Sequence, residues 1–265
     1  MASVYEALQR ARQGNHVQGR YGDGGSGPVP LRPRPAAREA PRAPVTQPPV
    51  TQPPVTQPPG PLAAELGSLL AAVRPLLDGD GGAVLQVVAA TSGEGTSTIA
   101  REFALLAATS GQRQTLLIDA NRGNPQTARG FNCDTSRGLV ELPWHTGDLR
   151  AAVQPIAGTL LSVACLIGER GPRRSDAQTV GELYNRLRDE FELIVVDCPA
   201  VASGEYLDLA PETADGVILV VKAETTRPAV VSHAKGQVEQ AGGHLLGAVL
   251  NRRGDYIPDF LYRML

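Results

Sequence analysis

Residues 83–109 read AVLQVVAATSGEGTSTIAREFALLAAT, and this stretch decides the fold class. An apolar run at Ala83–Ala90 leads straight into a glycine-containing loop, and the loop leads into a helical pattern over Ser97–Thr109. A strand, a glycine-rich turn and a helix in immediate succession are the setting of a phosphate-binding loop, where backbone N–H groups and the helix N-terminus surround phosphate oxygens. The stretch therefore predicts a P-loop NTPase-like α/β fold.

The loop fits the pattern [AG]xxxxGK[ST] at every defining position except one. Ala90, Gly95 and Ser97 take their places, but Thr96 stands where the lysine belongs. A charge-assisted contact of the kind that lysine makes contributes about 1.5–3 kcal/mol, so we expect ATP and Mg²⁺ to bind weakly. The residues predicted to bind the cofactor are Gly93, Glu94, Gly95, Thr96, Ser97 and Thr98. A glycine-rich turn that binds nothing is the alternative, and Arg122 is a candidate substitute for the lysine.

Further strands and helices alternate along the rest of the chain. Continuous apolar, β-branched runs of this kind, with helices between them, predict a mostly parallel sheet covered by helices on both faces. Ligands of such sheets bind beyond the carboxyl ends of the strands. Beyond the first strand, the predicted strands are Thr115–Ile118, Leu160–Leu166, Leu193–Val196, Val217–Val221 and Leu245–Leu250, and the later helices are Val180–Glu190 and Pro228–Ala241.

Two aspartates follow predicted strands at the edge where a ligand would bind. Asp119 comes after Thr115–Ile118, and Asp197 comes after Leu193–Val196. Beside a phosphate loop, such carboxylates are placed to hold Mg²⁺ or to accept a proton. We therefore predict that Ser97, Asp119 and Asp197 hold the metal and that Asp119 is catalytic if the protein is active. The alternative is that each aspartate caps the turn or helix that follows it.

Two segments of different character precede this domain, which we place at residues 62–265. Residues 1–13 predict a short amphipathic docking helix, with Ser3 and Glu6 in a capping-box arrangement. Residues 14–61 are rich in Gly and Arg and then carry VTQPP three times, which predicts a disordered, partly polyproline II linker. The linker would tether the helix to the domain.

Composition narrows the cellular setting and the partners. A formal net charge of −2 and the absence of a basic patch argue against nucleic acid as a partner. Three widely spaced cysteines indicate a reducing compartment, and no apolar run is long enough for a transmembrane segment. The sequence predicts a cytoplasmic protein that reaches the inner membrane as a peripheral component through a partner.

Several stretches resemble the bacterial tyrosine kinase (BY-kinase) family of capsule and exopolysaccharide systems, within the deviant-Walker ATPases. The resemblance lies in GEGTST (93–98), LLIDANRGNP (116–125), ELIVVDCPA (192–200), ADGVILVVKAETTR (214–227), LGAVLNRR (246–253) and VYEALQRA (4–11). It implies an ATP-dependent protein-tyrosine kinase with Mg²⁺. It also implies an inner-membrane chain-length or co-polymerase protein as the partner, and it leaves homo-oligomerisation open.

The departures from that family bear on its chemistry. Thr96 replaces the loop lysine, Asn121 replaces a second acid after Asp119, and Ala200 replaces a proline after Asp197. A tyrosine cluster is missing from the closing YIPDFLYRML (256–265), whose two tyrosines fit a packing segment. The ExxRxxR helix of ring-forming members has its counterpart at Glu65, followed by Ser68 and Ala71.

These departures favour a pseudokinase of exopolysaccharide, capsule or holdfast-type polysaccharide biosynthesis and export. One alternative is an active tyrosine kinase or ATPase of the same pathway that recruits a basic residue from elsewhere. Another is a partition- or septum-site-type ATPase, against which stands the absence of a second lysine early in the loop.

Overall fold

A computed structural model describes residues 63–77, 81–142, 148–169, 171–172 and 175–252. The predicted docking helix at 1–13 and linker at 14–61 lie outside these residues, and so do Pro143 and Trp144. Within the described part, no helix combines the length and the apolar character needed to cross a bilayer.

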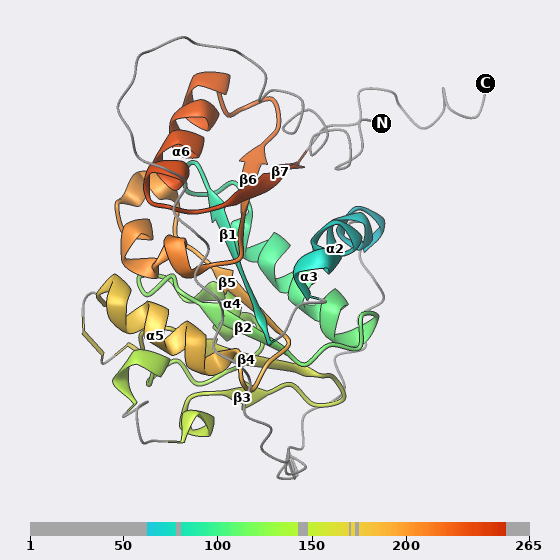
Figure 1. Cartoon of the computed structure of the whole chain (residues 1–265), viewed down its shortest axis with the longest axis vertical. Helices are drawn as coiled ribbons and strands as arrows, with labels where there is room; N and C mark the ends of the chain where they lie inside the picture. The colour runs from blue at the N-terminus through green and yellow to red at the C-terminus, as the bar shows by residue number, and fades with distance from the viewer. Residues whose placement is uncertain (1–62, 78–80, 143–147, 170, 173–174, 253–265) are drawn as a thin grey trace, which may run out of the picture.

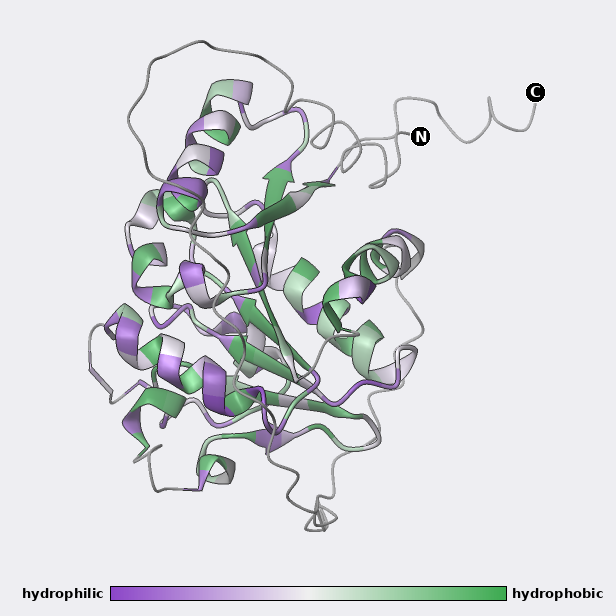
Figure 2. Ribbon diagram, viewed as in Figure 1, coloured by the Kyte–Doolittle hydropathy of each residue, from purple (hydrophilic) through white to green (hydrophobic). Residues whose placement is uncertain are grey.

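A seven-stranded sheet in the order β3-β4-β2-β5-β1-β6-β7 forms the centre of the molecule (Figure 1). Six strands are parallel, and only the short edge strand β3 runs antiparallel, beside β4. Because β1, β2 and β5 are interior and buried along their whole length, they consist of apolar residues with few exceptions (Figure 2). The strands are β1 Ala83–Ala89, β2 Thr115–Asp119, β3 Gln154–Pro155, β4 Leu161–Cys165, β5 Leu193–Asp197, β6 Gly216–Lys222 and β7 Leu245–Asn251.

Helices cover the sheet on both faces, and each face has its own apolar cluster. On one face, α2 (Ala63–Leu77) and α3 (Thr96–Thr109) pack together and against the strands. On the opposite face lie α5 (Ala177–Leu187) and α6 (Pro228–Gln240) (Figure 1). The predicted doubly covered, mostly parallel α/β sheet is confirmed.

The predicted strands, and the predicted helices that fall on described residues, are present with small shifts of their ends. The elements not predicted are α2, the five-residue helix α4 (Gln126–Gly130), the two-residue strand β3 and several short 3-10 turns. The counterpart of the ExxRxxR helix falls on α2, where Leu66, Leu69, Val73 and Leu77 are buried. The helix α4 follows β2, and this placement brings it to the edge of the sheet where the site lies.

Arg188 fastens the opposite, amino-terminal edge of the sheet. Its guanidinium donates to the main-chain carbonyls of Gly82 at 2.6 Å and Thr213 at 2.8 Å, and it pairs with the Asp215 carboxylate. Asp215 in turn accepts the Val84 N–H at 2.8 Å. One side chain therefore joins the end of α5 to the beginnings of β1 and β6.

Candidate phosphate-loop site

The loop between β1 and α3 has the backbone of a phosphate cradle. Gly93 and Gly95 have φ values of +85° and +96°, a backbone conformation that residues other than glycine rarely adopt. The first backbone bond of α3 runs from the Ile99 N–H to the Gly95 carbonyl at 3.1 Å. Among the described residues, none accepts a hydrogen bond from the amides of residues 93–98. These N–H groups are therefore available to an anion at the helix N-terminus.

Glu94 ties this loop to the ends of two other strands. Its carboxylate accepts the Thr91 N–H at 3.2 Å and the hydroxyl of Thr226, which lies just after β6. Its main-chain carbonyl accepts from the side-chain amide of Asn251, at the end of β7, at 2.7 Å. Glu94 is thus a buried acid that closes the loop on itself and fixes it to the sheet, and it is not directed outward toward solvent.

Asp119 and Asp197 stand opposite one another at the ends of β2 and β5, where they are register partners. The Asp119 carboxylate accepts two backbone amides, Asn121 N–H and Ala128 N–H, each at 3.0 Å. These bonds hold the turn after β2 and the start of α4. Asp119 therefore performs the capping task that the sequence analysis weighed as an alternative, while it lies beside Asp197.

One carboxylate oxygen of Asp197 accepts a hydrogen bond, and the other has no partner among the described residues. Oδ2 accepts the Thr127 hydroxyl of α4 at 2.5 Å. Oδ1 is buried and has no hydrogen-bond partner among the described residues. Native structures rarely leave such an atom unpaired without water or an ion, so this oxygen is a candidate ligand position.

Burial and mutual repulsion weaken the acidity of this pair. Burial, followed by the charge of Asp197, raises the pKa of Asp119 from 3.8 to about 7, even though the backbone amides of Ala128 and Asn121 act in the opposite direction. Burial raises the pKa of Asp197 to about 6, against the hydroxyls of Thr127 and Ser97.

No described cation neutralises these acids. Glu94, Asp119 and Asp197 are 2%, 2% and 1% exposed, and none of them forms an ion pair with a described Lys or Arg. Arg122, the candidate substitute for the lysine, instead donates to the carbonyls of Glu169 and Gly171 at 3.4 Å and 3.2 Å. The structure thus places that guanidinium on the 169–171 loop.

The residues present fit a phosphate and a divalent cation only in part. Free loop amides suit phosphate oxygens, and the Asp197 Oδ1 with the Ser97 hydroxyl suits Mg²⁺, which prefers oxygen ligands. What the site lacks is a positive charge at position 96. The predicted residues 93–98, Asp119 and Asp197 therefore lie around one edge of the sheet, with two carboxyls adjacent and the cation missing.

Three contacts of the site were not predicted from the sequence. Thr127 contacts Asp197, whereas Thr226 and Asn251 hold Glu94. Thr226 and Asn251 share one usable signal, because each follows or ends a predicted strand whose carboxyl end lies at the ligand edge. No comparable signal marks Thr127, because α4 was not predicted.

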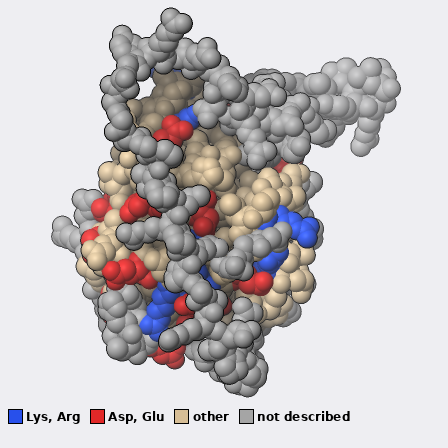
Figure 3. All heavy atoms as spheres, in the orientation of Figure 1, with Lys and Arg blue, Asp and Glu red and all other residues tan. Residues whose placement is uncertain are grey.

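The acidic and basic side chains of the molecule are interspersed on the face shown in Figure 3, in the part not covered by undescribed residues. No extended basic stripe of the kind that follows a nucleic-acid backbone is visible there.

Among known proteins, the chain is similar to a tyrosine-protein kinase and to a transport protein of succinoglycan biosynthesis. No family model matches the chain. It is 27% identical over 182 residues to the tyrosine-protein kinase CpsD of Streptococcus agalactiae, covering 67% of this chain and 77% of CpsD. It is 28% identical over 182 residues to the succinoglycan biosynthesis transport protein ExoP of Rhizobium meliloti, covering 67% of this chain and 23% of ExoP.

A solved structure shares the fold as well as the sequence similarity. The kinase domain of VpsO superposes with a TM-score of 0.59 at 27% identity, covering 73% of this chain and 93% of the domain. The similarity therefore covers most of this chain and nearly all of a solved kinase domain.

Proposed function

We propose that the chain, which is similar to bacterial tyrosine kinases, serves capsule or exopolysaccharide biosynthesis as a kinase-like protein with weakened or lost phosphoryl transfer. In this proposal the domain acts mainly by binding its partner protein. It takes the place of a kinase in that assembly, while its own phosphate loop lacks the positive charge that phosphoryl transfer requires.

One observation carries the proposal: Thr96 stands in the loop where a lysine is expected, next to three buried acids that no described cation neutralises. Phosphoryl transfer depends almost wholly on positioning and on neutralising charge. A triphosphate brought against Glu94, Asp119 and Asp197 meets like charge in a poorly solvated site, which costs binding energy. Weak nucleotide binding follows, and a slow or absent reaction follows from the same deficit.

The residues that remain have separate tasks if nucleotide binds. The amides of residues 93–98 would hold phosphate oxygens, and Ser97 with Asp197 would hold Mg²⁺. The metal would supply the charge neutralisation that the loop lacks. Asp119, held by two backbone amides, would orient the turn before α4 and is the catalytic candidate only if the protein turns over.

We further propose an inner-membrane chain-length or co-polymerase protein as the partner, with the chain cytoplasmic and peripheral to the membrane. The relative ExoP, a transport protein of succinoglycan biosynthesis of which this chain matches 23%, supports the link to polysaccharide transport. The predicted docking helix at residues 1–13 and its tether at 14–61 supply a means of attachment. A complex isolated with such a protein, and lost on removal of residues 1–13, is the corresponding test.

The decisive experiment restores the missing charge. Thr96→Lys and the control Thr109→Lys add the same charge to the same helix, but only the first places it at the loop position, since Thr109 is exposed at the far end of α3. Titration with a fluorescent ATP analogue and Mg²⁺ should show weak binding by the wild type, about ten- to a hundredfold tighter binding by Thr96→Lys, and no gain for Thr109→Lys. Micromolar binding with turnover by the wild type would overturn the proposal.

An active kinase or ATPase is the second candidate, favoured by the open oxygen of Asp197. If it is correct, tyrosine phosphorylation or ATP hydrolysis should be measurable in the wild type and should disappear in Asp197→Asn and Asp119→Asn. Equal activity in these variants and the wild type would show that the measured turnover comes from a contaminant or another site.

A further inference from the structure

One of the two lysines of this chain stands at the ligand edge of the sheet. Lysine and arginine together number 25, and only Lys222 and Lys235 of these are lysines. Lys235 is exposed on α6 and pairs with Glu239 at 3.7 Å. Lys222 is the half-buried last residue of β6, the strand beside β1. Its ammonium forms no hydrogen bond or ion pair with a described residue, so this charge is available to a ligand.

Alternation along β6 places Lys222 on the face of the sheet that α3 covers. Ile218 and Val220 pack in the apolar cluster of that face, whereas Val221 belongs to the cluster of the opposite face. Side chains two residues apart on a strand share a face, so Lys222 follows Val220 onto the side of α3. The amino end of α3 is where the phosphate loop ends. Lys222 and the loop therefore lie on the same side of the sheet.

The register between strands brings Lys222 level with the loop. Lys222 is the partner of Asn251 on β7, and the Asn251 side chain donates to the Glu94 carbonyl at 2.7 Å. A Cβ at Gly95 would lie 2.1 Å from the same Asn251 amide. Neighbouring strands lie about 5 Å apart, and the stem of a lysine carries its ammonium about 6 Å from its Cα. The ammonium of Lys222 is therefore within reach of an anion held beside Gly95.

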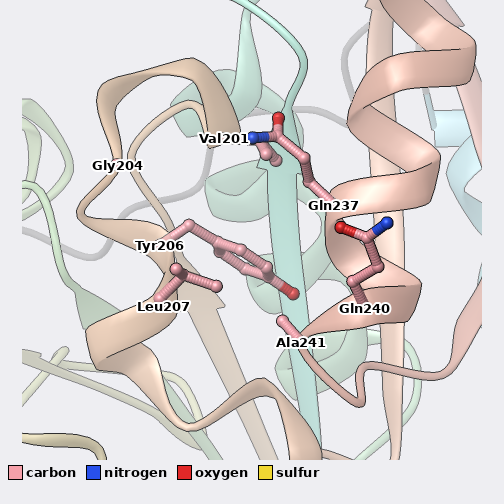
Figure 4. A pocket seen from close by; sticks show the side chains of 7 residues that line it. All are labelled: Val201, Gly204, Tyr206, Leu207, Gln237, Gln240 and Ala241. Atoms are coloured by element: carbon pink, nitrogen blue, oxygen red, sulfur yellow. The ribbon is translucent and has the colours of Figure 1, made fainter.

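Other cations near this edge are less well placed. Arg122 donates to carbonyls of the 169–171 loop, and Arg252 follows β7, one strand farther from β1. Arg227 caps the start of α6, which covers the opposite face. Figure 4 shows a hollow on that face, between α6 and the segment after β5, and neither Lys nor Arg lines it. Lys222 combines an unpaired charge with a place beside the loop, on the face of α3.

We propose that Lys222 binds the phosphate groups of a nucleoside di- or triphosphate held by the amides of the loop. The inference rests on the proposed function for the identity of this ligand. A lysine ammonium on its flexible stem serves phosphate as a point charge. The lysine that Thr96 replaces would act from the start of α3, whereas Lys222 acts from the neighbouring strand β6. Lys222 adds affinity and leaves position 96 without a charge, so binding without efficient phosphoryl transfer is the expected result.

Amine labelling of the full chain tests this contact without any substitution, because Lys222 and Lys235 are its only lysines. Acetylation with an N-hydroxysuccinimide ester, followed by mass spectrometry of the peptides, gives a labelling rate for each lysine. Millimolar inorganic pyrophosphate, or ADP with Mg²⁺, should slow the labelling of Lys222 severalfold and leave that of Lys235 unchanged. An unchanged rate at Lys222, or equal protection of both lysines, would overturn the proposal.

Substitution measures how much Lys222 contributes to affinity. Lys222→Met keeps an apolar stem and removes the charge, so it should weaken binding of a fluorescent ATP analogue with Mg²⁺ about tenfold. The loss should appear in the wild-type chain and again in the Thr96→Lys chain, which binds more tightly. Lys222→Arg keeps the charge and should retain most of the affinity. The matched control Lys235→Met removes the other lysine and should leave the affinity unchanged.

The outcomes separate this inference from the proposed function. Equal affinity of Lys222→Met and its parent in both chains would overturn the role of Lys222 and leave the proposed function as it stands. No measurable binding by either parent chain would also overturn the role of Lys222. Micromolar binding with turnover by the wild type, weakened in Lys222→Met and not in Lys235→Met, would overturn the proposed function and support Lys222 as a phosphate-binding residue.

Discussion

Asn251, the last residue of β7, donates a hydrogen bond of 2.7 Å from its side chain to the main-chain carbonyl of Glu94, 157 residues earlier. The contact explains the glycine that follows Glu94. A Cβ at Gly95 would lie 2.1 Å from the Asn251 Nδ2, and Gly95 also has a φ of +96°. The end of the last strand thus fixes the shape of the phosphate loop near the other end of the domain sequence.

Replacing Asn251 should loosen this loop. Asn251→Ala leaves the Glu94 carbonyl without its partner, and a buried carbonyl that loses its partner costs about 1–3 kcal/mol. Asn251→Asp keeps the shape but presents a carboxylate oxygen to the carbonyl, so it should destabilise at least as much. Urea unfolding measures the loss. Asn124→Ala, at an exposed position, is the control, and an equal loss there would remove the special role of Asn251.

The stability of the metal-free protein should fall as pH rises toward neutrality. The pKa of Asp119 is about 7 in the folded protein against 3.8 in an exposed carboxyl, so the folded state binds the extra proton between these values. As far as this group is concerned, stability is therefore highest below about pH 3.8, decreases as pH rises from there to about pH 7, and changes little above that. Between pH 5 and 8 the expected loss is about 2–3 kcal/mol.

Asp119→Asn tests this dependence, with unfolding measured in EDTA at pH 5 and pH 8. The variant should show a smaller loss of stability between the two pH values than the wild type. Asp189→Asn, at the surface, should keep the wild-type dependence. If the wild type has the same free energy of unfolding at pH 8 as at pH 5, the raised pKa of Asp119 is contradicted.

The three thiols should react slowly in the native protein. Burial raises the pKa of Cys133 to about 11 and that of Cys165 to about 12, and it raises the pKa of Cys198 well above its ordinary value. Little thiolate is therefore present at pH 8. A thiol reagent such as DTNB should give no rapid phase in the native chain and three equivalents after unfolding. A rapid equivalent that disappears in Cys133→Ser would contradict this expectation.

Arg188 should matter more to stability than any exposed ion pair of the protein. Arg188→Met removes the donors to Gly82 and Thr213 and leaves Asp215 without its guanidinium. Breaking a buried pair from one side typically costs about 3–5 kcal/mol, and the partial exposure of this pair places the expected loss at the lower end. Arg129→Met, which removes a solvent-exposed pair with Glu169, should change the free energy of unfolding little. Equal effects would contradict the role assigned to Arg188.

Local patterns in the sequence were enough to predict the fold class and most of its elements. A strand, a glycine-rich loop and a helix occupy adjacent residues in 83–109, and each apolar strand is a run that is visible without its partners. The missing lysine at position 96 and the aspartates at 119 and 197 are likewise local facts. The small elements α4 and β3 escaped because runs of five and two residues carry no usable periodicity.

The contacts that shape the site were decided only by tertiary structure. The amino-acid sequence by itself determined a strand-loop-helix unit with carboxylates at strand ends and no cation in the loop. Tertiary structure decided that Asn251 and Thr226 hold Glu94, that Thr127 engages Asp197, and that Asp119 and Asp197 are register partners. The physical reason is that these contacts depend on the order β2-β5-β1-β6-β7 and on the register between strands. Side-chain periodicity defines each strand but does not specify its neighbours.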